Sequence, residues 1–424
     1  MSDMLLKNIT LDSARKDILI SGGRIDRITD AGLCSGPVCP DGAEVVDCSG
    51  KVAVPGFVNM HTHAAMSLMR GIGEDMLFTD WIKKIWKVEE NIDREYVYWA
   101  SKAACLEMIR TGTTTFNDQY WYSDETYRAA IEMGLRPALG YDIMDKGDAS
   151  EASRQKEQCE KFYEKFGNRN DAGIYEVAFH AIYSVSEEMM LWISDFARRH
   201  DLNLHIHLSE TRSEVEDCRA LHGGLSPVEY LDSLGILNDR VLAAHTLWLS
   251  EKDIEILARR GVHCIHNINS NAKISSGYRF LYNELRDAGI NICLGTDGCA
   301  SSNNLDMLEA MKTSAIFQKA WRDDPSAMPL AELMNMATLN GAKALRFDGG
   351  VIREGAVADI NIVNTDNTFF LSDGDFLANL VYSAHSDCID SVTAGGRFVM
   401  RGREVPGEDK ILREARKVLE KLRK

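Results

Sequence analysis

The sequence of 424 residues lacks several features that would direct it to a membrane or to nucleic acid. No uncharged apolar run is long enough to span a bilayer, and the opening MSDMLLKNITLDSARKD has no signal-peptide core. Positive charge is scarce: 48 Lys and Arg stand against 64 Asp and Glu, a net charge of −16. Such a surface repels phosphate backbones and anionic lipids. We therefore expect no nucleic-acid partner, no membrane partner and a cytoplasmic location.

Paired cysteines are also missing. The ten cysteines are scattered singly, without a C-x-x-C pair, and a chain of this size needs no disulfides to hold its core. Free and mostly buried thiols are the expected state, which agrees with a reducing cytoplasm.

What the chain does contain is an alternation of strand-length apolar runs and longer segments with helical spacing. The runs are VPGFVNM, TTTFND, RPALGYD, YEVAFHA, LNLHIHLSE, VLAAHT, GVHCIHN and INICLGTD. Helical segments at 186–200, 226–234, 250–260 and 305–321 intervene. About eight such units predict an α/β fold, a (β/α)₈ TIM barrel, over residues 55–350.

The two ends of the chain share a different pattern, in which short β-type runs alternate with turn signals. Neither 1–54 nor 351–406 has enough apolar residues to close a core alone, so we predict that together they form one composite β-sandwich. The last stretch, 407–424, has the apolar stripe of an amphipathic helix. We expect this helix to dock on the fold.

Ionisable and amide side chains recur where the predicted strands end. They are His61 and His63, Asn117 and Asp118, His180, His207 and Glu210, His245, His266 and Asn267, and Asp297. The carboxyl ends of barrel strands meet at one mouth, and unpaired buried charge is costly, so this placement predicts one shared site. On an extended strand His61 and His63 point to the same side.

This group includes the donors that a catalytic metal needs. Three imidazoles and a carboxylate are available as ligands: His61, His63, His207 and Asp297. Glu210 would then be free to act as an acid or base, and His245 would orient the activated water. His205 shares a strand face with His207 and is the alternative ligand, while the role of His266 stays open.

These motifs resemble the amidohydrolase superfamily. PGFVNMHTHAAMSLMRG, HLSE, AAHT, HNINSN and LGTDGCASSNNLDM stand in that family's order and cover almost the whole chain. They are most similar to the 5-methylthioadenosine/S-adenosylhomocysteine deaminases and their triazine-hydrolase relatives. Binuclear members carry a bridging lysine on strand four, where this chain has His180. The resemblance therefore implies one divalent ion, Zn²⁺ or alternatively Fe²⁺, and a homo-oligomer.

The chemistry that the resemblance implies is hydrolytic deamination of an adenosine-type nucleoside, such as 5′-methylthioadenosine or S-adenosylhomocysteine. Hydroxide on the metal attacks the amino-bearing ring carbon and ammonia leaves. Asp297 takes the proton from the water, Glu210 protonates a ring nitrogen and His245 stabilises the attacking hydroxide.

Substrate contacts also follow from the resemblance. Trp81 and a carboxylate of WIKKIWKVEE match nucleoside contacts, with Glu89, or its neighbour Glu90, on the ribose hydroxyls. His180 matches a position that contacts the base.

Several motifs depart from close relatives, which read WPxE, GPHAPYT and HNPxSN where this chain has WKVE, AFHAIYS and HNINSN. An arginine that contacts substrate after strand three is absent from LGYDIMDKG, where Tyr141 stands near its place. The alternative is therefore a guanine, pterin, cytosine-type or triazine ring as substrate. A non-catalytic scaffold would have lost Glu210, His245 or Asp297, and all three are present.

Overall fold

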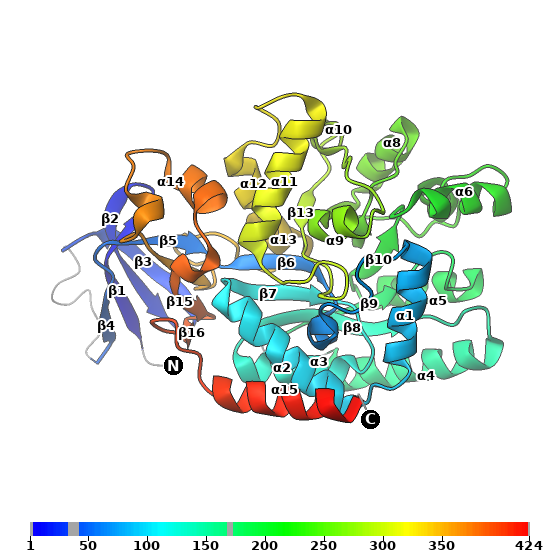
Figure 1. Ribbon diagram of the computed structural model, residues 1–424, viewed down its shortest axis with the longest axis horizontal. Coiled ribbons are helices and arrows are strands. Elements are labelled where there is room, and N and C mark those ends of the chain that lie inside the picture. The colour runs from blue at the N-terminus through cyan, green and yellow to red at the C-terminus, as the bar shows by residue number, and fades with distance from the viewer. Residues whose placement is uncertain (1–2, 33–41, 168–172, 423–424) are drawn as a thin grey trace.

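A computed structural model describes residues 3–32, 42–167 and 173–422. It divides into a barrel surrounded by helices and a separate sheet built from both ends of the chain (Figure 1). The predicted fold class, a parallel α/β barrel with an additional β domain, is confirmed.

The barrel consists of eight parallel strands that pair in chain order. They are β6 (Phe57–Thr62), β7 (Thr113–Asp118), β8 (Arg136–Ile143), β9 (Ile174–Phe179), β10 (Leu204–Leu208), β11 (Val241–His245), β12 (His263–His266) and β13 (Ile292–Leu294). The circle closes just after β13, where the backbone N–H of Asp297 donates to the carbonyl of His61 at 2.9 Å. This bond brings the last predicted ligand next to the first.

Burial explains why these runs form strands of a covered parallel sheet. Every residue of β6, β7, β10, β11 and β13 is buried, as expected when helices cover a sheet whose other face lines the barrel. Val58, Met60, Leu242 and Ile265, from three of the strands, share one buried apolar cluster. Polar side chains gather toward the carboxyl ends of the strands, where the cavity opens.

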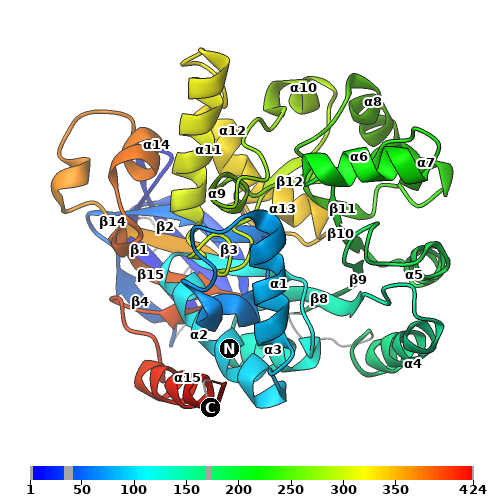
Figure 2. The same ribbon diagram turned by 45° about the vertical axis from the view of Figure 1, so that its right-hand side comes forward.

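Helices connect the strands and cover the barrel. They are α2 (Arg94–Arg110), α3 (Ser123–Met133), α4 (Ala149–Phe166), α5 (Glu187–Arg199), α6 (Arg212–Leu221), α7 (Pro227–Ser233), α8 (Glu251–Arg260), α9 (Ile268–Lys273), α10 (Tyr282–Asp287), α11 (Met307–Arg322), α12 (Leu330–Met336) and α13 (Leu339–Ala344). The four helical segments expected from spacing correspond to α5, α7, α8 and α11. One more helix, α1 (Phe78–Glu89), lies across the front of the barrel (Figure 2).

The second sheet joins strands from the two ends of the chain. They are β1 (Met4–Leu11), β2 (Ala14–Ser21), β3 (Arg24–Asp30), β4 (Glu44–Asp47), β5 (Lys51–Pro55), β14 (Ile360–Asn364), β15 (Ile389–Ala394) and β16 (Arg397–Met400). The sheet branches at β1, which pairs with β4 along its first half and with β5 near its end. Antiparallel pairing of β14 with β5 joins the two ends, and Leu6, Ile20 and Ile360 share one core.

The short α14 (Phe376–Ala378) lies between β14 and β15, and the terminal α15 (Glu408–Leu422) follows β16. Helix α15 runs alongside α2 (Figure 1), where Arg110 Nη2 donates to Glu408 Oε1 at 2.6 Å. Within the described ranges, no helix has both the length and the apolar character that a bilayer crossing requires. Eight cysteines are buried with free thiols, and Cys34 and Cys39 lie outside the described residues.

Candidate active site

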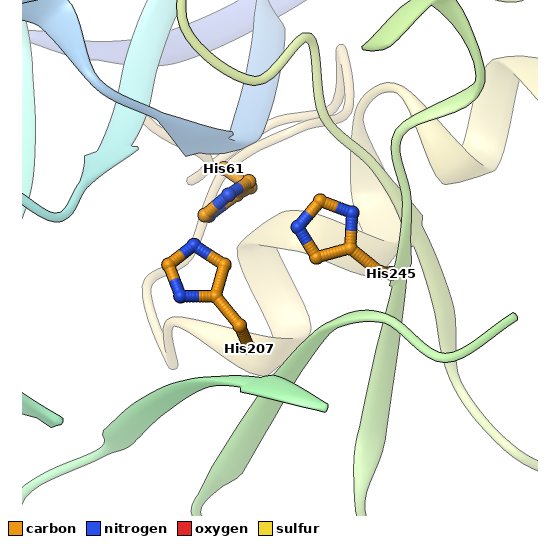
Figure 3. Close-up of side chains that lie close together, drawn as sticks. All are labelled: His61, His207 and His245. Atoms are coloured by element: carbon orange, nitrogen blue, oxygen red, sulfur yellow. The ribbon is translucent and has the colours of Figure 1, made fainter. Parts of the chain in front are cut away.

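Four side chains from three distant parts of the chain converge at the mouth of the barrel. His61 and His63 come from the end of β6, His207 from β10 and Asp297 from the segment after β13. Asp297 Oδ1 lies 3.3 Å from His63 Nε2 and 3.6 Å from His61 Nε2. The rings of His61 and His207 are 4.9 Å apart between centroids (Figure 3). Ligand atoms held tetrahedrally by zinc lie roughly 3.4 Å from one another, so these spacings fit such an ion.

Hydrogen bonds on the far side of the rings leave the Nε2 atoms free to bind a cation. His63 Nδ1 donates to the carbonyl of Gln119 at 2.5 Å, and His207 Nδ1 donates to the carbonyl of His180 at 2.8 Å. The buried Nε2 of His61 has no hydrogen-bond partner among the described residues. Because an orphaned buried ring nitrogen is costly, it fits a position meant for a metal ion.

His205, the alternative ligand, supports His61 from behind. Its Nε2 is 3.0 Å from His61 Nδ1, and its Nδ1 is 3.5 Å from Glu176 Oε1. His205 Nε2 is therefore committed to His61, and its Nδ1 faces the carboxyl group of Glu176. This arrangement favours His207 as the ligand from β10, with His205 fixing the orientation of the His61 ring.

His245, at the end of β11, faces His61 and His207 closely enough that its ring could also contribute a ligand atom (Figure 3). However, Asn271 Nδ2 donates to His245 Nδ1 at 2.9 Å, which leaves the ring proton on Nε2. A protonated nitrogen cannot bind a metal. This Nε2 lies 3.9 Å from Glu210 Oε2, so it can donate a hydrogen bond within the site.

The backbone is strained at this end of the barrel. Ser209, His245 and Asp297 adopt the left-handed conformation, with φ of 53°, 75° and 64°. Each such residue costs on the order of 1 kcal/mol, and residues of this kind gather at functional sites. These backbone conformations turn the side chains at the ends of β10, β11 and β13 toward the mouth of the barrel.

Burial keeps two of the metal-facing imidazoles neutral. It holds the pKa of His61 and His207 well below the ordinary value, and the neighbouring imidazoles act in the same direction. At His63 burial is outweighed by the charge of Asp297 and a backbone hydrogen bond, which raise the pKa. Burial also opposes ionisation of Asp297, but the charges of His63 and His245 outweigh it and lower the pKa of this carboxyl. The cluster therefore offers imidazole nitrogens and one carboxylate, the donor set of a catalytic zinc site.

Glu210, in contrast to Asp297, has a raised pKa. Burial, assisted by the charge of Asp297, raises the pKa of Glu210 to about 8, so the carboxyl carries a proton at neutral pH. Its backbone is held in place by Glu214, whose carboxylate accepts the N–H of Ser209 at 2.8 Å and that of Glu210 at 2.7 Å. Glu210 is thus a positioned proton donor beside the cluster.

A cavity opens above these residues. Eight of the residues singled out from the sequence line it: His63, Trp81, Glu89, His180, His207, Glu210, His245 and Asp297. His61 lies beneath them, fully buried. Helix α1 supplies one wall through residues that include Phe78, Trp81 and Trp86.

The structure distinguishes between the two neighbouring glutamates at the end of α1. Glu89 is buried, lines the cavity and accepts a hydrogen bond from the hydroxyl of Tyr120 at 2.7 Å. Burial raises its pKa to about 7. Glu90 is exposed and does not reach the cavity. His180, on the other side, is kept neutral because burial lowers its pKa to about 3.

Some lining residues were missed from the sequence, among them Gln119, Tyr120 and Asp142. Asp142 ends the third barrel strand, so the rule that identified the other polar strand ends could have found it. Tyr141 instead bonds Gln158 through its hydroxyl and does not line the cavity. His266, whose role was open, stacks on Phe280 with ring centroids 4.1 Å apart and also lies outside the lining.

Comparison with known proteins gives consistent matches over nearly the whole chain. Residues 52–399 match the amidohydrolase family. A 5′-deoxyadenosine deaminase of Methanoregula boonei is 43% identical over 88% of this chain and 84% of the relative. A 5-methylthioadenosine/S-adenosylhomocysteine deaminase of Pyrococcus horikoshii is 37% identical over 95% of this chain and 94% of the relative.

A solved structure has the same architecture. The crystal structure of an adenosine deaminase from Xanthomonas campestris with bound zinc superimposes with a TM-score of 0.92 at 29% identity. The match covers 99% of this chain and 98% of that structure. The likeness therefore includes the barrel and the sheet formed by the two ends.

Proposed function

The chain belongs to the amidohydrolase family, and we propose that it is a metal-dependent hydrolytic deaminase of adenosine-type nucleosides. The observation that carries the proposal is the protonated Glu210 beside a cluster of imidazoles and one aspartate, at the base of a cavity that also holds Glu89. The relatives named as deaminases of 5′-deoxyadenosine and of 5-methylthioadenosine/S-adenosylhomocysteine support the same activity, hydrolysis of a C–N bond outside peptides.

The ligands that we propose are His61, His63, His207 and Asp297. When bound, a divalent cation, in our proposal Zn²⁺ with Fe²⁺ as the alternative, supplies a water molecule activated for attack on the amino-bearing ring carbon. The orphaned Nε2 of His61 and the short spacings to Asp297 support this assignment.

The remaining groups handle protons. In the proposed reaction Asp297 accepts a proton from the attacking water, and Glu210 donates its proton to a ring nitrogen as the carbon becomes tetrahedral. His245 donates a hydrogen bond from Nε2 to the attacking oxygen, a role supported by the bond from Asn271 to its Nδ1. The amino group takes the proton held by Asp297 and leaves as ammonia, and the hydroxyl proton of the adduct returns to Glu210 as the ring carbonyl forms.

Substrate contacts complete the proposal. Trp81 offers an indole face to the nucleoside, Glu89 accepts hydrogen bonds from ribose hydroxyls, and His180 contacts the base. Their shared lining of one cavity supports these roles.

A substrate panel tests the function. We expect ammonia release and loss of the adenine absorbance band with 5′-deoxyadenosine, 5′-methylthioadenosine or adenosine, at a kcat/KM orders of magnitude above that for guanine, a pterin, cytosine or a triazine. Faster turnover of one of the latter rings, or no turnover of any adenine nucleoside, would reject the proposal.

Glu89→Gln should weaken the ribose contact. A hydrogen bond to a charged group contributes about 1.5–3 kcal/mol, so kcat/KM for adenosine should fall roughly 10- to 150-fold, mainly through KM. A 2′,3′-dideoxy analogue should be affected much less.

Because the Glu89 pKa is about 7 and the ionised form accepts best, wild-type kcat/KM should rise as the pH increases through 7, and the variant should lose this rise. Steady-state kinetics of both substrates, with Glu90→Gln as the matched control, measure these effects; an equal loss in the control would reverse the assignment.

We further propose three structural units: a β-sandwich formed by 1–54 with 351–406, a barrel over 55–350 and a terminal helix over 407–424. We also propose a cytoplasmic location and a homo-oligomer. Its partners would be small molecules, without nucleic acid or membrane. The eight buried free thiols and the net charge of −16 support the location and the absence of polyanionic partners.

A further inference from the structure

One carboxyl group in the cavity has no role in the reaction described above. Asp142 lies at the end of β8 and lines the cavity together with Glu89, Glu210 and Asp297. Its Oδ1 accepts a hydrogen bond from Gln119 Nε2 at 2.9 Å, and no described residue donates to its Oδ2. Gln119 therefore holds one oxygen in place while the other stays available to a ligand.

Asp142 lies on the same side of the cavity as Glu89, the proposed contact to the ribose. Its charge raises the pKa of Glu89, so the two carboxyl groups lie near each other. Met144 and the indole of Trp86 line the same cavity. We therefore take the 5′ substituent of a nucleoside to lie near Asp142 when its ribose hydroxyls reach Glu89.

No lysine or arginine side chain forms this wall. Among the described residues that line the cavity there is no lysine or arginine, although four carry carboxyl groups. Lys146 is exposed and lies over the ring of Trp86, 4.7 Å from its centroid, outside the lining, although its charge acts on Glu89 and lowers the pKa of that carboxyl against the effect of burial. An anionic group on the substrate would find no cationic side chain in the lining itself and would face a carboxylate.

We propose that Asp142 is a specificity-determining residue that rejects adenine nucleosides with an anionic 5′ substituent and accepts uncharged ones or hydrogen-bond donors. This inference rests on the proposed function and makes it narrower, because it separates neutral nucleosides from nucleotides and 5′-carboxylates. At an assay pH of 8 Asp142 is ionised, since burial raises its pKa only to about 6.

The test compares two substrates of almost equal shape, adenosine 5′-carboxamide and adenosine 5′-carboxylate. Two like charges about 6 Å apart in a partly wet cavity disfavour binding roughly 100-fold, so the wild-type kcat/KM should favour the amide by about that ratio. Asp142→Asn keeps the shape and removes the charge, and should reduce the ratio at least tenfold. The ratio is taken within each variant, so a general loss of activity or stability cancels.

Control variants distinguish failure of this inference from failure of the proposed function. Asp80→Asn removes an exposed charge from α1 outside the cavity and should keep the wild-type ratio, while Lys146→Ala tests whether that ammonium receives the anion. A wild-type ratio near one, or an unchanged ratio in Asp142→Asn, would overturn the inference while turnover of 5′-deoxyadenosine still supported the deaminase. Loss of turnover with all adenine nucleosides in the wild type would overturn both.

Discussion

Removing the metal is expected to abolish deamination, with kcat falling at least about 10³-fold and returning when Zn²⁺ is added. The physical reason is that none of the nearby side chains replaces the cation: three imidazoles cannot generate a nucleophile from water by themselves. Dialysis against a strong chelator, followed by elemental analysis and an ammonia assay on the same sample, measures the effect. Circular dichroism shows whether the barrel remains folded.

Substitution of a ligand should reproduce the chelation result. Asp297→Asn is expected to lower both metal content and kcat, because Asp297 Oδ1 faces both His61 and His63 at 3.6 and 3.3 Å. His385→Gln changes an exposed histidine far from the site and serves as the control for handling and nonspecific metal binding. Full activity in protein freed of metal would refute the assignment of the site.

Glu210→Gln is expected to lower kcat by about 10²- to 10⁴-fold, the usual contribution of a general acid, while metal content stays the same. The glutamine keeps the size of the side chain and can still donate a hydrogen bond, so KM should change little. It cannot deliver a proton to the ring nitrogen. Rapid-mixing or steady-state kinetics with 5′-deoxyadenosine measure the loss, and Glu216→Gln on the exposed face of α6 is the matched control.

The pH profile gives a second readout for the same residue. The pKa of Glu210 lies at about 8, raised by burial and by Asp297, and the protonated form is the active one. Wild-type kcat/KM should therefore decline as the pH rises through this value, and Glu210→Gln should show no such decline. A variant that keeps most of the wild-type rate together with its alkaline limb would show that another group supplies the proton.

Much of the fold could be predicted from local patterns. Strand-length apolar runs alternating with helical spacing indicated a parallel barrel, and the structure pairs all eight runs in chain order. These predictions succeed because periodicity follows from the backbone geometry of each element, which nearby residues determine. Polar side chains at strand ends are equally visible, since a buried barrel leaves them no other place.

The sequence could not decide between the two members of two residue pairs, His205 with His207 and Glu89 with Glu90. His205 and His207 point to the same face of one strand, and only the positions of His61 and of the carbonyl of His180 show which ring nitrogens are already hydrogen-bonded. The pair Glu89 and Glu90 likewise depended on how α1 rotates against Tyr120.

The sequence alone therefore determined the barrel, the family and the group of side chains that meet at its mouth. Tertiary structure decided which neighbour enters the cavity, how α1 covers it and that Asp142 lines it in place of Tyr141. The physical reason is that the direction of a side chain along one element is a local property. Its hydrogen-bond partners and the walls of a cavity come from residues far away in the chain, and packing alone brings these together.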